Sequence, residues 1–326
     1  MGLGIESTAH TFGASIVNSD EKVLADCREV YKAPPGSGIH PREASRHHAD
    51  MAPSVLAECF DRAKIRAPEL DFIAYSAGPG LGPCLRVGAV VARSLSSFYG
   101  KPLVPVNHAV GHLELGSMLC SMDSPVCLLV SGGHTAVVLP AGHRWRIFGE
   151  TLDITIGQLL DQFGRHIGLG SPCGPAIEKM ALEGTKLAEL PYVVKGNDVS
   201  FSGLLTAAKN QLGHMGREDL ACSLQEYAYA MLCEVTERAL AFSESEELLV
   251  VGGVSANKRL MEMIGTVAER QGARSATSPP AFSGDCGAQI AWAGLRHFRS
   301  GLSVRPVEGF VRQAWRLDTV DVPWRD

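Results

Sequence analysis

The hydrophobic pattern at the start of the chain predicts three strands followed by a long helix. Short apolar runs predict strands at residues 2–6, 12–17 and 23–30. From Pro41 onward apolar residues recur at helical spacing, which indicates an amphipathic helix. A strand (72–75), a helix (85–98) and another strand (103–106) are predicted next. Asn107 then predicts a helix start, because an asparagine side chain accepts hydrogen bonds from the first free N–H groups.

The second part of the chain repeats this order. Strands are predicted at 126–130, 136–139 and 145–148, then a helix at 218–242, a strand at 248–251, a helix at 258–270, a strand at 273–277 and a helix at 285–299. Both halves follow the order β-β-β-α-β-α, which indicates two similar α/β lobes facing each other across a cleft. We expect an N-terminal lobe at 1–124 and a C-terminal lobe at 125–326 with a helical insertion, whose last helix packs back on the first lobe. One large α/β domain is the alternative.

Composition and charge limit the classes of protein to which this chain can belong. The chain has 326 residues, 45% of them hydrophobic, so it can bury a large core. Its nine cysteines form no CxxC pair, which favours reduced core thiols over disulfides or a cysteine metal site. No apolar run is long enough to span a membrane and no signal peptide begins the chain, so we expect a cytoplasmic protein without membrane contact. The net charge of −5 requires any RNA to meet a local basic patch or a partner subunit.

Two glycine turns indicate a phosphate or nucleotide site. In the turn VSGGHT, Ser131, Gly132 and Gly133 lie between two predicted strands. Glycine has no Cβ, so backbone N–H groups there can approach an anion closely, although a plain hairpin turn would use the same residues. The segment VVGGVSANKRL (250–260) joins an apolar strand to a helix N-terminus through a second glycine pair. That arrangement favours a bound nucleotide.

Polar residues near these turns are candidates for the sugar and base of a nucleotide. Asn257 either hydrogen-bonds a ribose or base or stabilises the start of a helix. Asp161, Gly174 and Glu178 flank the rigid turn SPCGP (171–175), and carboxylates there could bind sugar hydroxyls. The alternative is that these carboxylates are simply solvated, as most helical carboxylates are.

A histidine pair provides the clearest metal signal. His108 and His112 are four residues apart, so both imidazoles lie on one helix face and can share a cation. Ala109 stands where a zinc protease needs a glutamate, which disfavours peptide hydrolysis. We expect Asp285, exposed at a helix start in FSGDCG (282–287), to be the third ligand of an open site that acts as a Lewis acid. The alternative is a histidine pair with a packing role.

Eight motifs together resemble one known family. They are GIESTAHT (4–11), GIHPREASRHHA (38–49), GPGLGPCLRVG (78–88), VNHAVGH (106–112), VSGGHT (130–135), FGETLD (148–153), SFSGLLT (200–206) and GGVSAN (252–257). They resemble the universal tRNA threonylcarbamoyladenosine synthase family, once called O-sialoglycoprotein endopeptidase. The segment ELPYVVKGNDVSFSGLL (189–205) is similar to the archaeal and eukaryotic branch, which works within the KEOPS complex.

The resemblance implies a fold, a reaction and partners. The fold is α/β, a duplicated RNase H-like fold of the actin, acetate-kinase and sugar-kinase class (ASKHA). The reaction is transfer of threonylcarbamoyl from threonylcarbamoyl-AMP to the N6 amine of adenosine 37 in ANN-decoding tRNAs. The implied cofactors are one iron or zinc ion and the ATP or AMP moiety of the substrate, with magnesium a further candidate. The partners are tRNA and KEOPS-type subunits: a small atypical protein kinase, a small dimerising subunit and a kinase-binding regulatory subunit.

Carried over by position, the resemblance assigns roles to individual residues. The metal ligands would be His108, His112 and Asp285, and the nucleotide would be held by Ser131, Gly132, Gly133, Asp161, Gly174, Glu178 and Asn257. No covalent nucleophile is expected, and no side chain is assigned as general base. Archaeal relatives usually have a tyrosine ligand where this chain has Leu129, and Leu129 and His134 resemble the bacterial branch instead.

Two other functions fit parts of the same pattern. A small-molecule kinase of this fold would share both glycine turns but would not require His108 and His112. A non-catalytic ATP-binding scaffold subunit is the other alternative, and the intact glycine turns and three candidate metal ligands speak against it.

Overall fold

The computed structural model describes residues 1–34 and 36–325; Pro35 and Asp326, the last residue of the expected second lobe, lie outside it. The chain forms two five-stranded sheets, in the orders β3-β2-β1-β4-β5 and β12-β11-β6-β7-β8. The first contains β1 (Gly2–Glu6), β2 (Thr11–Val17), β3 (Val23–Val30), β4 (Phe72–Gly78) and β5 (Leu103–Asn107). The second contains β6 (Val126–Val130), β7 (Thr135–Pro140), β8 (Trp145–Glu150), β11 (Glu247–Val251) and β12 (Arg274–Thr277).

Both sheets have the same pairing. In each, the first three strands are antiparallel neighbours, and the two later strands add in parallel beside the first strand. The predicted duplication of β-β-β-α-β-α is therefore confirmed, as is the two-lobed α/β fold class. The division of the chain at residue 124 remains a prediction.

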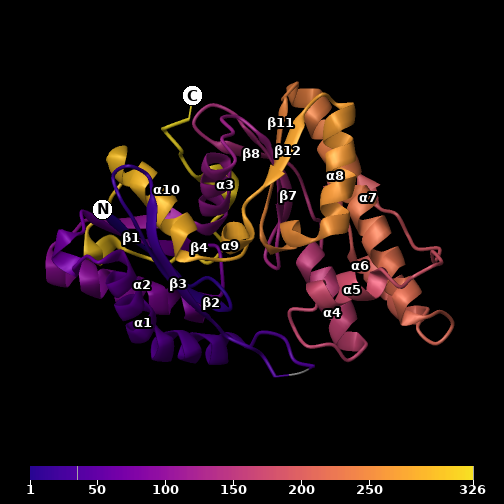
Figure 1. The fold of residues 1–326 in the computed structure, drawn as a ribbon, viewed down its shortest axis with the longest axis horizontal. Coiled ribbons are helices and arrows are strands. Elements are labelled where there is room, and N and C mark those ends of the chain that lie inside the picture. Colours follow the sequence, from indigo (N-terminus) through magenta and orange to yellow (C-terminus); the bar gives the residue numbers. More distant parts are fainter. Residues whose placement is uncertain (35, 326) are drawn as a thin grey trace.

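Helices cover the first sheet on both faces (Figure 1). On one face lie α1 (Pro41–Ala63) and α2 (Gly82–Tyr99), and on the other lies α10 (Gly287–Arg299), which also packs on α3 (His108–Leu119). Helix α10 approaches β1 closely, because a Cβ placed on Gly4 would lie 2.1 Å from the backbone nitrogen of Ala291. The last long helix of the chain thus packs on the first sheet.

The second sheet carries α7 (Arg217–Ser243) and α8 (Lys258–Arg270), together with an insertion of three helices between β8 and α7. The insertion comprises α4 (Ile156–His166), α5 (Gly174–Ala181) and α6 (Ser202–Asn210), with a small hairpin of β9 (Val194–Lys195) and β10 (Asp198–Val199). Shorter helices are η1 (Ala67–Glu69), η2 (Gly253–Ala256), α9 (Pro280–Ser283), η3 (Pro306–Glu308) and η4 (Leu317–Thr319). In Figure 1, α4, α5 and α6 gather at the end of α7 away from β12.

All nine cysteines are free thiols, seven of them buried, as predicted. In the part of the chain that the structure describes, we find no helix with the length and apolarity needed to cross a membrane.

Candidate functional site

The predicted histidine pair lies in the first two turns of α3. Asn107 caps this helix, because its side chain accepts hydrogen bonds from the N–H groups of Ala109 and Val110 at 3.0 and 3.2 Å. The helix therefore begins at His108, and His112 follows one turn later on the same face. The two ring centroids are 4.8 Å apart, and both side chains are buried.

Asp285 completes a cluster of three side chains that can bind a metal. Its Oδ1 lies 3.4 Å from His108 Nε2 and 3.3 Å from His112 Nε2. The ligand atoms of the three residues all lie within 4.8 Å of one another, so the structure brings the predicted ligands together. Two imidazole nitrogens and one carboxylate oxygen suit iron or zinc and leave coordination positions for a substrate. Their role as ligands remains a prediction.

Asp285 lies directly before Cys286, the N-cap of α10, as predicted to within two residues, but the prediction that it is exposed is wrong. Helix α10 begins at Gly287, and the Asp285 side chain is only 15% exposed. Arg28 on β3 donates to the carbonyl oxygen of Asp285 at 3.1 Å, which holds this turn against the first sheet. It is Asp26, not Asp285, whose carboxylate accepts from the N–H of Ala288 in the first turn of α10, at 3.0 Å.

The charges of the cluster are tightly coupled. Burial lowers the pKa of His108, but the carboxylates of Glu6 and Asp285 outweigh burial and raise this pKa to about 10. Burial raises the pKa of Asp285, but His108 and His112 outweigh it and hold that pKa well below its usual value. A bound cation would therefore replace a proton that His108 shares with the carboxylates.

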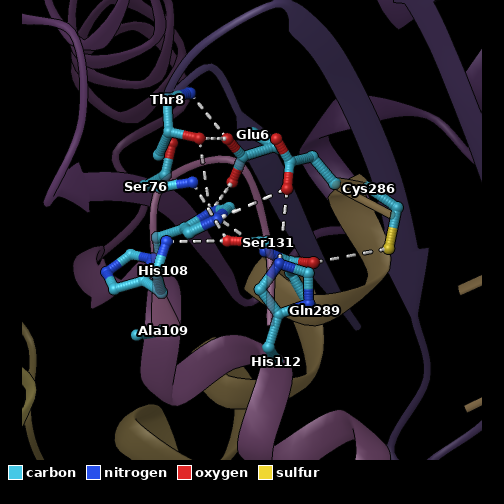
Figure 2. Close-up of polar contacts among 12 residues, drawn as sticks. Glu6, Thr8, Ser76, His108, Ala109, His112, Ser131, Cys286 and Gln289 are labelled. Carbon is cyan, nitrogen blue, oxygen red and sulfur yellow. Dashed lines mark hydrogen bonds and ion pairs between the residues drawn. The ribbon is translucent and has the colours of Figure 1, made fainter. Parts of the chain in front are cut away.

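The buried carboxylate of Glu6, which was not predicted from the sequence, lies beside His108 (Figure 2). Glu6 ends β1, is fully buried, and places Oε2 3.0 Å from His108 Nδ1. Its Oε1 accepts from the N–H of Thr8 at 2.6 Å. The signal in the sequence was an acidic residue closing an otherwise apolar strand, which is costly unless the carboxylate has partners.

The two glycine turns lie side by side. Gly252 has a φ of +96°, and a Cβ there would lie 2.3 Å from the carbonyl oxygen of Val130, so the second turn packs directly on the end of β6. In the first turn, Gly132 and Gly133 are exposed, and a Cβ placed on either would meet no atom within 4 Å, although Gly157 packs closely on the Gly132 backbone from the other side. Ser131 Oγ accepts from the N–H of Gly133 at 3.2 Å, so part of this turn's hydrogen-bonding capacity is used internally.

His134 connects the first glycine turn with the metal-binding cluster. Its imidazole stacks on that of His108, with ring centroids 6.2 Å apart and an interplanar angle of 24°. Burial, followed by the nearby charges of His108 and His112, lowers the pKa of His134 to about 3, so its ring is neutral at physiological pH. The predicted phosphate turn and the predicted metal ligands therefore meet at one place.

Asp161 and Gly174 lie at the SPCGP turn of the insertion. Asp161 on α4 accepts from the N–H of Cys173 at 2.6 Å and from the hydroxyl of Ser171 at 2.9 Å, so the carboxylate braces the turn. Gly174 is the first residue of α5. The predicted role of both residues in nucleotide binding is not tested by these contacts.

Glu178 and Asn257 meet at the start of α8. Asn257 caps this helix by accepting from the N–H of Leu260 at 3.0 Å, and it donates to Gln225 Oε1 at 2.7 Å. Glu178 accepts from the N–H of Lys258 at 2.8 Å. Two roles were predicted for Asn257. Its contacts are those of a helix cap, and a contact with a ribose or base remains a prediction.

Leu129 is fully buried in β6, where it pairs with Ala136 and Val251. Its side chain belongs to the hydrophobic core that includes Val110 and Leu113 of α3. This position therefore contributes packing against the helix that carries His108 and His112, and no ligand atom.

Comparison with known proteins identifies the family. The family described as TsaD, tRNA N6-adenosine threonylcarbamoyltransferase, matches residues 22–292. This chain belongs to that family. The tRNA N6-adenosine threonylcarbamoyltransferase of Ignicoccus hospitalis is 48% identical over 326 residues and covers 99% of each chain. The enzyme of that name from Methanopyrus kandleri is 48% identical over 332 residues, 99% of this chain and 96% of its own.

Solved structures of more distant proteins confirm the fold. HypF of T. kodakarensis superposes with a TM-score of 0.64 at 15% identity, over 92% of this chain and 48% of its own, so this chain spans about half of HypF. Component A of the (R)-2-hydroxyglutaryl-CoA dehydratase of Acidaminococcus fermentans superposes with a TM-score of 0.56 at 12% identity, over 90% of this chain and 97% of its own. Both share the ASKHA-type two-lobed fold with this TsaD family member.

Proposed function

We propose that this chain acts in threonylcarbamoyladenosine biosynthesis, transferring threonylcarbamoyl from threonylcarbamoyl-AMP to the N6 amine of adenosine 37 in ANN-decoding tRNAs. The observation that carries the proposal is membership of the tRNA N6-adenosine threonylcarbamoyltransferase family over nearly the whole chain. The convergence of His108, His112 and Asp285 beside the glycine turns supports it, because a cation held next to a phosphate site can stabilise the charge that develops on the attacked carbonyl oxygen.

The donor set fits a single divalent ion, and we take iron or zinc as the candidates and magnesium as a less suitable one. Two imidazoles and a carboxylate match the ligand preferences of iron and zinc, whereas magnesium prefers oxygen ligands. When bound, such an ion supplies Lewis-acid polarisation of the carbonyl that is attacked. The residues of the chain hold and orient the ion, with Asn107 fixing the start of the helix that presents both histidines.

The nucleotide half of the donor is assigned to the second lobe. Its contacts would come from Ser131, Gly132, Gly133, Asp161, Gly174, Glu178 and Asn257. Open space at Gly132 and Gly133 supports the approach of a phosphate group. No covalent intermediate is proposed, because an amine attacking an activated acyl donor requires mainly positioning, and AMP leaves toward the glycine turns.

The partners are tRNA and KEOPS-type subunits, namely an atypical protein kinase, a dimerising subunit and a kinase-binding regulatory subunit, and the compartment is the cytoplasm. A net charge of −5 supports the need for such partners, because tRNA binding requires a basic surface that this chain does not supply overall. RNA recognition of this kind also requires the target base to leave the stack of the loop.

The test is mass spectrometry of tRNA nucleosides after incubation of the chain with bicarbonate, threonine, ATP, the adenylate-forming synthase and candidate partner subunits. We expect threonylcarbamoyladenosine with the wild type and with H214A, an exposed histidine outside the site, and its loss with H112A and D285N. Absence of the modified nucleoside with every set of partner subunits would overturn the proposed transferase function. Full activity of H112A and D285N would overturn the metal role, and phosphorylation of a small metabolite instead would favour a kinase.

A further inference from the structure

Three buried groups surround one nitrogen of His108. The Glu6 Oε2 and the Gln289 side-chain nitrogen each lie 3.0 Å from His108 Nδ1, and the Thr8 hydroxyl lies 3.4 Å away. Glu6 and Gln289 are fully shielded from solvent. The other ring nitrogen, Nε2, points toward Asp285 Oδ1 at 3.4 Å. The Nε2 edge of the imidazole therefore meets the candidate metal site, and the Nδ1 edge meets the buried polar groups of Glu6, Thr8 and Gln289 (Figure 2).

The donor and acceptor chemistry of these groups selects one tautomer. A ring nitrogen either donates an N–H or accepts through its lone pair, and it cannot do both. The Glu6 carboxylate only accepts, as its bond from the N–H of Thr8 at 2.6 Å also shows. A lone pair on His108 Nδ1 would face the carboxylate at 3.0 Å and be repelled, whereas an N–H there forms a charge-assisted hydrogen bond. Gln289 fits the same tautomer, because its amide can turn its carbonyl oxygen toward the ring.

This tautomer has a direct consequence for metal binding. With one N–H on Nδ1 facing Glu6, the second proton of His108 lies on Nε2 facing Asp285, the carboxylate that also contacts His112. A cation that replaces this second proton then meets the lone pair of Nε2. A metal-binding histidine usually donates its second N–H to a carboxylate or carbonyl, which fixes the ring and raises its basicity. Glu6 itself faces away from the cluster formed by His108, His112 and Asp285, so it is not a ligand.

We propose that Glu6 is a positioning residue of the metal centre, which holds His108 in the Nδ1–H tautomer and thereby directs the Nε2 lone pair at the ion. This inference rests on the proposed function of the same site. The competing explanation is purely structural, in which Glu6 only ties the end of β1 to the start of α3. The two explanations differ in what happens to metal affinity when Glu6 loses its charge and the fold is kept.

The experiment titrates the full metal-free chain with Co²⁺ and follows the ligand-field absorption and the melting temperature. The test variant is E6Q, which has nearly the same volume but donates from one side-chain atom. The control is E114Q, which changes a buried glutamate on α3 whose partners are remote from His108 Nδ1. We expect E6Q to weaken Co²⁺ binding about 10- to 100-fold with an altered spectrum. E114Q should lower the melting temperature and keep an affinity near that of the wild type.

The outcomes separate this inference from the proposed function. Wild-type affinity in E6Q overturns the role of Glu6 and leaves the metal site intact. Failure of the wild type to bind Co²⁺ overturns the metal site itself. Should E6Q not fold, the nitrogen NMR signals of the histidine rings in the Zn²⁺-loaded wild type decide the question. A protonated Nδ1 on His108 supports the inference, and a protonated Nε2 overturns it.

Discussion

Glu114 anchors the C-terminal segment to the helix that carries the histidine pair, and replacing it should destabilise the protein strongly. Its side chain is 4% exposed. Oε1 accepts from Trp145 Nε1 at 2.9 Å and from Arg325 Nε at 2.6 Å, and Oε2 accepts from Trp324 Nε1 at 2.7 Å. One carboxylate thus joins α3, β8 and the chain end near residue 325, which lie next to one another in Figure 1.

The expected loss of stability follows from the buried groups that lose their partner when Glu114 is replaced. In E114Q the volume is kept, but the charge is lost and one acceptor becomes a donor facing donors. Arg325, whose side chain is 11% exposed, then lacks its buried anion, and one of the two indole N–H groups, that of Trp145 or that of Trp324, faces the new amide donor. Breaking a buried ion pair from one side costs about 3–5 kcal/mol, a large part of a typical stability of about 5–15 kcal/mol. For a chain of this size we expect the melting temperature to fall by about 6 °C.

The assay is urea unfolding followed by tryptophan fluorescence, with E58Q as the matched control. Glu58 pairs with Arg62 on the exposed face of α1, at 49% and 60% exposure, where loss of an ion pair costs at most about 1 kcal/mol. A cycle with R325M isolates the pair, and we expect a coupling energy of about 1.5 kcal/mol or more between positions 114 and 325. A loss in E114Q no larger than that in E58Q would refute the reasoning.

Two further predictions concern local structure. The Asp153 carboxylate accepts hydrogen bonds from residues 200–202, which outweigh burial and hold its pKa below the usual value. Its contribution is therefore present above about pH 4 and decreases as the pH falls below that value. D153N should cost about 1 kcal/mol at pH 7 and progressively less at lower pH, measured by urea unfolding at several pH values. G252A should lower the melting temperature and cost about 1–3 kcal/mol of stability, because the φ of Gly252 is +96° and the new Cβ would collide with the Val130 carbonyl oxygen. G253A is the control and should be nearly neutral, because a Cβ at Gly253 would meet no atom within 4 Å.

Much of the fold could be predicted because local signals and tertiary structure agree. The apolar runs at β1, β3 and β6 and the periodic segment of α8 match the observed bounds, since each is flanked by turn or capping residues. The start of α2 was predicted three residues too late, at residue 85. The helix begins at Gly82 with Pro83 in its first turn, and the prediction overlooked the preference of proline for that position.

The candidate site was less predictable, because most of its contacts join residues distant in the chain. The spacing of His108 and His112 indicated one helix face directly, whereas the environment of Asp285 depends on Arg28, 257 residues away. The contacts of Glu178 and Asn257 with residues of α7 and α8 likewise follow only from tertiary packing. Glu6 was missed for the same reason, since nothing near it in the sequence shows that His108 will lie beside it.

The site combines elements that belong to different sheets. His108 and His112 lie on α3, which follows β5 directly. Asp285 precedes α10, which packs on the first sheet. The glycine turns extend from the ends of β6 and β11 in the second sheet. In both sheets these are carboxyl ends of parallel strands, where open α/β sheets bind ligands. Because His134, in the turn between β6 and β7, stacks on His108, the relative position of the lobes sets the distance between the predicted phosphate turn and the predicted metal ligands. The geometry of the reaction would therefore depend on the packing of α3 between the lobes as much as on the ligands themselves.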